Sequence, residues 1–96
     1  MAHFTTRIEL YNANLGDYIR LHKEMEMEKF SRIVVGDKGI KCKLPTGEYD
    51  KAGNFTIDDV LECAKRASVK VGKRYSVLVT EANSRIWFQL EAVKTK

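Results

Sequence analysis

The amino-acid sequence predicts an α+β fold in a single domain that spans residues 1–96. Two stretches have the apolar spacing of amphipathic helices; a predicted β-hairpin separates them, and stretches of alternating apolar and polar residues flank them. Hydrophobic residues make up 44% of the chain and charged residues 31%, which is typical of a folded domain with one modest core. The composition therefore excludes a disordered or low-complexity chain.

The chain begins with a predicted strand and a predicted helix. Residues 4–10 place mainly apolar side chains (Phe4, Thr6, Ile8 and Leu10) on one side and polar side chains (Thr5, Arg7 and Glu9) on the other, which indicates a strand with one buried face. Asn14 is a favourable helix N-cap, and Asp17 places a carboxylate at the positive end of the helix dipole. Over residues 15–29 apolar side chains recur at spacings of three and four, so we expect a helix with one apolar face that ends at Phe30.

A β-hairpin is predicted next. Residues 31–35 are rich in β-branched side chains, and residues 40–44 alternate between apolar and charged side chains. The loop between them ends at Gly39, where we expect a positive backbone φ. Residues 45–47 stop the second arm, and residues 48–55 are expected to form a long irregular connection.

A second helix follows this connection. Thr56 and Asp59 resemble a capping box, and they precede an apolar stripe over residues 57–71. Gly72 is a natural residue to end this helix. The sequence therefore predicts a helix that is capped at both ends.

Two extended segments complete the predicted fold. They cover residues 75–80 and 86–90, a turn at residues 82–84 joins them, and residues 92–96 are expected to form a frayed tail. The element order is then strand, helix, strand, strand, helix, strand. This is the order of a ferredoxin-like βαββαβ two-layer sandwich, here with an additional C-terminal strand.

In such a sandwich both helices cover one face of the sheet, and the other face is open. We expect the open face to be basic with apolar spots and to contain Thr5, Arg7, Glu9, Tyr11, Arg32, Val34, Lys41, Lys43, Ser76, Leu78 and Thr80. Residues 86–90 are more apolar than a frayed edge requires, and they are expected to cross onto a second copy. We therefore predict a homodimer through the C-terminal strand or through the sheet.

Sequence signals also limit the class of protein. No apolar run has the length of a membrane span and the N-terminus lacks the pattern of a signal peptide, which predicts a cytoplasmic protein without membrane contact. Cys42 and Cys63 are expected to be reduced thiols. Phosphate-binding glycine loops, GxSxG and HExxH are absent, so we predict neither a cofactor nor a metal. The net charge of +4 permits a nucleic-acid partner.

His22 is the candidate for chemistry near neutral pH. It belongs to the apolar face of the first predicted helix, four residues after Tyr18. One interpretation is a histidine at the boundary between core and solvent. The other is a residue that transfers a proton or contacts a phosphate, because Arg20 and Lys23 flank it and positive charges there lower its pKa.

Two groups of cations also have two interpretations each. Residues 65–74 contain five positive charges and no negative one, which fits either a solvated helix end or a contact surface for a nucleic-acid backbone. Lys41 and Lys43 either discourage edge pairing of the hairpin or contact nucleic acid. The acidic residues of the two helices fit a helix start and a water-facing side rather than a catalytic or metal site: Glu24, Glu26, Glu28, Asp58 and Asp59.

Part of the sequence resembles a known family. The residues that carry the resemblance are Phe30-Ser31-Arg32-Ile33-Val34, Gly39-Ile40, Leu44 and Tyr49. They resemble the matching stretch of the GhoS antitoxins of type V toxin–antitoxin systems, whereas the second helix and the last strands agree in pattern only. The resemblance implies a ferredoxin-like endoribonuclease, related in fold to the CRISPR Cas2 proteins, that silences its partner toxin by cleaving the mRNA of the toxin.

The resemblance also implies catalytic residues. The basic residues of the antitoxin's first helix fall at Arg20 and His22, and the acidic end of its first strand falls near Glu9. Residues 10–12 replace the segment in which Cas2 proteins hold a metal-binding Asp, so a metal-independent mechanism is implied. In that mechanism a basic residue stabilises the developing phosphorane charge, His22 moves a proton and the 2′-OH of the RNA attacks.

We therefore expect an RNA-binding protein, with metal-independent cleavage of a toxin mRNA as the activity that the resemblance implies. The expected RNA contacts are Arg7, Arg32, Lys41, Lys43, Lys65, Arg66, Lys70, Lys73 and Arg74. One alternative is a non-enzymatic, dimeric ferredoxin-like module that binds a protein or a small ligand. Another is a member of the same family that has kept the fold and lost the nuclease activity. An RNA-binding surface keeps its cations accessible, whereas a dimer interface buries or pairs them.

Overall fold

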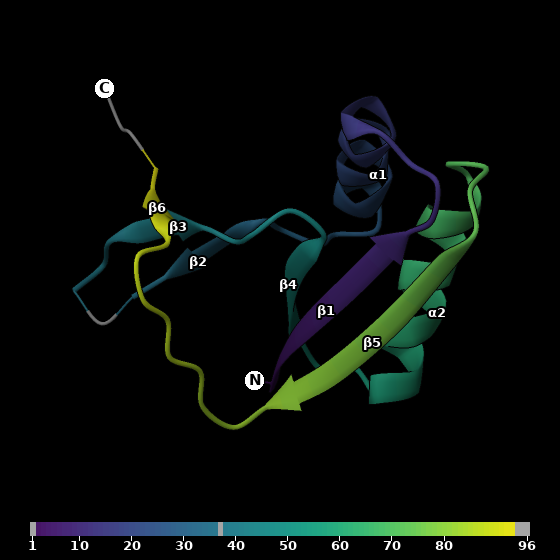
Figure 1. Cartoon of the computed structure of the whole chain (residues 1–96). Helices are drawn as coiled ribbons and strands as arrows, with labels where there is room; N and C mark the ends of the chain where they lie inside the picture. The colour runs from purple at the N-terminus through teal and green to yellow at the C-terminus, as the bar shows by residue number, and fades with distance from the viewer. Residues whose placement is uncertain (1, 37, 94–96) are drawn as a thin grey trace.

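Two antiparallel sheets and two helices make up the structure, a computed structural model that describes residues 2–36 and 38–93. In chain order the elements are β1 (Ala2–Leu10), α1 (Leu15–Met27), β2 (Ile33–Val35), β3 (Lys41–Lys43), β4 (Glu48–Gly53), α2 (Ile57–Val69), β5 (Tyr75–Ala82) and β6 (Glu91–Ala92) (Figure 1). The prediction of an α+β fold is confirmed.

The main sheet has the strand order β4-β1-β5, with antiparallel pairing on both sides of β1. Thr5 of β1 pairs with Asp50 of β4 and with Thr80 of β5, which sets the register. Both helices lie on one face of this sheet (Figure 1), because alternate residues of β1 bury their side chains there. The core between sheet and helices contains Phe4, Ile8, Leu10, Leu21, Met25, Phe30, Tyr49, Val60, Ala64, Ala67 and Val71.

Both predicted helix starts are confirmed. Asn14 accepts a hydrogen bond from the Asp17 N–H, and the Asp17 carboxylate accepts one from the Asn14 N–H, both at 3.0 Å. Thr56 and Asp59 make the same reciprocal pair at the start of α2. The first helix ends at Met27, before the predicted end, because Lys29 has a φ of 69° and turns the chain back into the core.

The predicted hairpin is confirmed and belongs to a second, smaller sheet with the order β2-β3-β6. Gly39 has the expected positive φ, 75°. This sheet projects from the body of the molecule, and a segment that follows β5 runs alongside it (Figure 1). We call residues 83–90 of that segment the strap. A second apolar cluster lies between the hairpin and the strap, and it contains Val34, Cys42, Leu44, Trp87 and Leu90.

The prediction of an irregular connection over residues 48–55 is wrong, since residues 48–53 form β4, an outer strand of the main sheet. Its inward side chains are Tyr49 and Lys51, both almost fully buried. A lysine at an inward position hides the two-residue period that indicates a strand. An isolated bridge between Ser31 and Asp50 continues the sheet beyond β4.

The open face of the main sheet therefore differs from the predicted one. From β1 and β5 it carries the expected residues, Arg7, Glu9 and Leu78 among them, but Lys41 and Lys43 lie in the second sheet. Val34 is buried in the second cluster. In their place β4 contributes Glu48, Asp50 and Ala52. The face holds carboxylates as well as arginine, so the expectation of a basic sheet face is wrong.

The strand predicted over residues 86–90 is also wrong. Gln89 has a φ of 58°, which interrupts an extended backbone, and the short strand β6 forms only at Glu91–Ala92. Trp87 and Leu90 pack against the hairpin of the same chain. Of the predicted tail, Ala92 belongs to β6 and residues 94–96 lie outside the described residues. A homodimer through this segment stays a prediction.

Both cysteines, Cys42 and Cys63, are free thiols. Neither helix in the described part of the chain combines the length and the apolar character that crossing a membrane requires.

Candidate nucleic-acid interface

His22 and Tyr49 form a hydrogen-bonded pair between α1 and β4. The distance from His22 Nδ1 to the Tyr49 hydroxyl oxygen is 2.6 Å, and the two rings meet edge to face with centroids 5.7 Å apart. Tyr49 is 1% exposed, and its ring also meets Phe30 edge to face. The pair therefore joins the first helix to the strand that the sequence did not predict.

The surroundings of this pair keep His22 neutral at physiological pH. Burial is the main cause that lowers the pKa of His22 to about 4, and the positive charges of Arg32 and Lys43 contribute to the same decrease. The predicted direction is correct, but the cations responsible belong to the hairpin rather than to the neighbouring positions on α1. Burial raises the pKa of Tyr49, so its hydroxyl keeps its proton.

The tautomer of His22 follows from hydrogen-bond satisfaction. Among the described residues the Tyr49 hydroxyl has one partner, His22 Nδ1, so it donates its proton to that nitrogen. The other ring nitrogen, Nε2, then carries a hydrogen. Neutral His22 is thus a hydrogen-bond donor and suits contact with a phosphate oxygen, whereas a general base needs a free lone pair at that nitrogen.

The hairpin cations near His22 have few anionic partners. Within residues 2–36 and 38–93, neither Arg32 nor Lys41 forms an ion pair, and Lys43 lies 3.8 Å from Glu91 with both side chains well exposed. Arg32 donates to the Leu44 carbonyl at 3.4 Å, and its buried Nε has no partner in the described part of the chain. These cations keep most of their capacity to bind an anion.

The cations of α2 are in a different state. The ion pairs that join α1 and its C-cap, Glu28, to α2 and the residues just after it are Asp17–Lys73 at 3.9 Å, Glu24–Lys70 at 3.6 Å and Glu28–Arg66 at 3.0 Å. Their order along the two helices is reversed because the helices run antiparallel. Lys65 pairs with Glu62 of its own helix, and Arg74 stacks on the Tyr11 ring. The five positive charges that the sequence groups together are thus engaged, mostly by carboxylates.

The three candidate catalytic residues do not share one location. Arg20 donates to the Val71 carbonyl at 2.8 Å and lies 3.5 Å from Asp17, at the end of α2. Glu9 is exposed on the open face of the main sheet, where it lines a shallow hollow with Arg7. His22 lies on the other side of the sheet with Tyr49. No arrangement for concerted proton transfer results from these positions.

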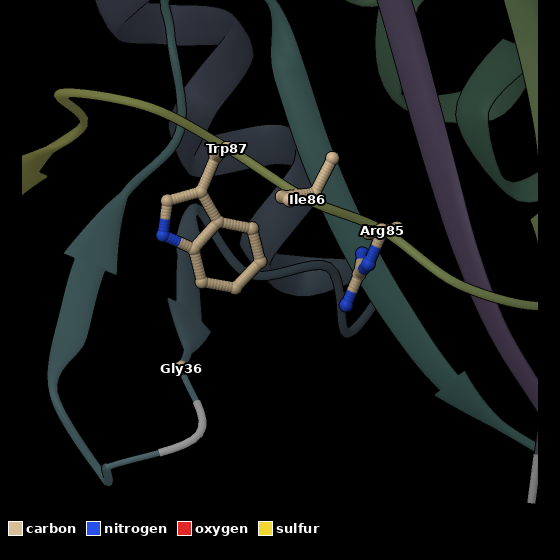
Figure 2. Close-up of a pocket in the computed structure, with 4 residues that line it drawn as sticks. All are labelled: Gly36, Arg85, Ile86 and Trp87. Atoms are coloured by element: carbon tan, nitrogen blue, oxygen red, sulfur yellow. The ribbon is translucent and has the colours of Figure 1, made fainter.

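Sequence reasoning missed a cleft between the strap and the main sheet. It has a volume of about 320 Å³, and Thr5, Leu44, Pro45, Glu48, Arg85 and Trp87 are among its lining residues. A smaller groove lined by Gly36, Arg85, Ile86 and Trp87 adjoins it (Figure 2). In Figure 2 the indole of Trp87 points from the strap toward Gly36 of the hairpin. The apolar character of residues 86–90 was the available signal, although it suggested a different role.

Lys51 is a second feature that the sequence did not predict. Its side chain is 4% exposed, and its ammonium group donates to the Glu28 carbonyl at 2.6 Å, beyond the last turn of α1. The same ammonium lies 5.1 Å from the centroid of the Phe30 ring and 4.6 Å from that of Phe55. A cation at the negative end of the helix dipole stabilises the helix, so Lys51 has a structural role.

No group of three or more His, Cys, Asp or Glu side chains that could hold a metal ion occurs in the described ranges. Comparison with protein-family models finds no match for the chain, and comparison with curated proteins finds none either.

Proposed function

We propose that this chain binds single-stranded RNA through the cations of its hairpin. The observation that carries the proposal is the positive field that Arg32 and Lys43 produce at His22: Arg32 has no ion pair among the described residues, and the one partner of Lys43 there, Glu91, is well exposed and 3.8 Å away. Lys41 and Lys43 are exposed, as an RNA-binding surface requires. Phosphate groups would lie against these side chains, and the Nε2–H of His22 would donate to a phosphate oxygen. The resemblance to the GhoS antitoxins favours RNA over other polyanions and makes a toxin mRNA the natural first substrate to test.

Strand cleavage is not part of this proposal. The residues that the resemblance implies, Glu9, Arg20 and His22, lie in three different environments. With Nε2 protonated and a pKa of about 4, His22 is suited neither to accept a proton nor to supply one at neutral pH. A family member that binds RNA without cutting it fits these features better than a nuclease does.

We also infer a ferredoxin-like relationship for the main sheet. Three features support it: β1 is central between β4 and β5, both helices cover one face, and Ser31 bridges to Asp50 on the outer side of β4. The bridge marks the position of the remaining strand of a four-stranded ferredoxin-like sheet. In this chain residues 33–35 leave that sheet after the bridge and form the separate hairpin.

The test is binding of a mixed-sequence single-stranded RNA at several salt concentrations. We expect log affinity to fall linearly with log salt, with a slope near −0.7 for each phosphate contacted. The Arg32→Ala/Lys43→Ala variant should bind RNA about tenfold more weakly, and its slope should correspond to about two fewer phosphate contacts. The matched control, Lys65→Ala/Lys70→Ala, removes the same charge from engaged positions and should change the affinity less than threefold.

Incubation of the same RNA in EDTA and in magnesium tests cleavage at the same time. Intact RNA with salt-dependent binding is the expected result. Cleavage in EDTA that disappears in the Arg20→Ala/His22→Ala variant would restore the metal-independent nuclease. Either of two results would contradict the proposal: an equal loss of affinity in Arg32→Ala/Lys43→Ala and in Lys65→Ala/Lys70→Ala, or no RNA binding by the wild type. Either result would favour the non-enzymatic module that binds a protein or a small ligand.

A further inference from the structure

The cleft beside the strap has the size and lining of a site for one small planar group. Its volume of about 320 Å³ lies at the lower end of the range of roughly 300–1,000 Å³ that small-molecule sites occupy. Leu44, Pro45 and Trp87 provide apolar walls, and the main sheet contributes Thr5 and Glu48. An apolar slot with a few polar groups is the usual construction of a ligand site.

Glu48 is the distinctive polar group of this cleft. It is partly buried, and its carboxylate has no hydrogen bond or ion pair within the described ranges. Asp50, on the same face of β4, is in the opposite state, because Arg85 donates to it at 2.7 Å and His3 lies 3.6 Å away. Because no protein group pairs with Glu48 in the described part of the chain, its two oxygens are free to accept hydrogen bonds from a ligand in the cleft.

The chemistry of the lining points to a particular ring. A carboxylate accepts hydrogen bonds only, and its two oxygens match two parallel N–H donors. Guanine presents two such donors on one edge, N1–H and N2–H. Adenine and cytosine place a ring acceptor beside their amino group, and uracil places its single N–H between two carbonyl groups. Of the four RNA bases, guanine therefore satisfies Glu48 best.

We propose that this cleft binds a guanine base of single-stranded RNA, which deepens the RNA-binding function and rests on it. The ring lies against the Trp87 indole, and Glu48 accepts from N1–H and N2–H. Both hydrogen bonds of Arg85 use Nη1, so its other N–H groups can donate to O6. The cleft adjoins the backbone site through Leu44, whose side chain lines the cleft and whose carbonyl accepts from Arg32.

Trp87 makes the proposal directly testable because it is the single tryptophan of the chain. Titration of the whole protein with each of the four nucleoside 5′-monophosphates, followed by tryptophan fluorescence, should give the tightest binding with GMP. Glu48→Gln should weaken GMP binding at least tenfold and bring it to the level of the other nucleotides, since an amide offers one acceptor in place of two. Glu26→Gln is the matched control: it makes the same chemical change on the exposed side of α1 and should leave the GMP preference intact.

Two results would overturn the proposal: an equal fluorescence response to all four nucleotides, or a Glu48→Gln variant that retains the GMP preference. Absence of any response, confirmed by calorimetry, would also overturn it. Circular dichroism of each variant checks that the fold is retained. Oligouridylate binding tests the hairpin cations independently of the cleft. Failure of the guanine site with intact oligouridylate binding is therefore distinguishable from failure of the RNA-binding function.

Discussion

The helix pair and the hairpin contain the same kinds of cation in opposite electrostatic settings. Arg66 of α2 and Lys70, its C-cap, lie 3.0 and 3.6 Å from carboxylates of the C-cap of α1 and of α1 itself. On the hairpin, Arg32 and Lys41 have no such partner among the described residues, and the field of Arg32 and Lys43 acts on His22 instead. A run of positive residues therefore makes a positive surface only where the tertiary fold brings no carboxylates to it.

The largest expected change in stability comes from Trp87→Ala, and it should affect the second sheet without affecting the main sheet. Trp87→Ala removes the main strap side chain from the second cluster and should lower the free energy of opening of the second sheet by about 2–3 kcal/mol, because Trp87 is only partly buried. Hydrogen exchange measured residue by residue should show faster exchange in β2, β3 and β6. Amides of β1 should keep their protection. Equal loss of protection in β1 would show that the two sheets open as one cooperative unit.

Acidification should weaken the fold through His22. Well above pH 6.5 the side chain is neutral in the folded and the unfolded chain, so it adds no pH dependence there. As the pH falls from 6.5 toward 4, the unfolded chain takes up the proton first, and the free energy of unfolding decreases. The decrease should be on the order of 1 kcal/mol, since His22 is partly exposed and solvent screens it. Urea denaturation at a series of pH values should show the decrease in the wild type and not in His22→Gln.

The hairpin cations, and not those of the second helix, contribute to the low pKa of His22. In Arg32→Ala/Lys43→Ala, the pKa of His22 should rise only part of the way to 6.5, because burial is the larger cause. In Lys65→Ala/Lys70→Ala it should stay near the wild-type value. A titration of the His22 ring signals by NMR distinguishes these results. A rise in both variants would mean that the two groups of cations act on His22 alike.

The smallest expected effect is a change in RNA affinity when Lys70 and Arg66 lose their carboxylate partners. Glu24→Gln/Glu28→Gln removes the partners of Lys70 and Arg66 and should increase the affinity for RNA by about twofold to threefold at low salt. The loss in stability should stay below about 1 kcal/mol, since these pairs are largely exposed. Salt titration of RNA binding and thermal denaturation measure the two effects. An unchanged affinity would mean that α2 lies outside the path of the RNA.

Local signals in the sequence predicted the elements that depend on neighbouring residues. Asn14 with Asp17 and Thr56 with Asp59 form the expected caps, and Gly39 has the backbone conformation that its turn requires. These features depend on residues three or four positions apart, so sequence reasoning reaches them.

The features that sequence reasoning missed depend on residues far apart in the chain. Strand β4 was hidden because Lys51 points inward, and its burial is compensated by a carbonyl of residue 28 and by two aromatic rings. The carboxylates that pair with Arg66, Lys70 and Lys73 belong to the first helix or its C-cap, far away in the sequence. The cleft needs Glu48 and Trp87, which approach each other only when the strap crosses the sheet. No periodicity or motif connects such positions.

The strap also bears on how the chain folds as it leaves the ribosome. The inner face of the hairpin, Val34, Cys42 and Leu44, emerges long before Trp87 and Leu90, which cover it. Until those residues emerge, the hairpin has an uncovered apolar surface and an unpaired edge at β3, a state prone to aggregation. The second sheet, whose last strand and strap follow β5 in the chain, is therefore completed after the main sheet during synthesis.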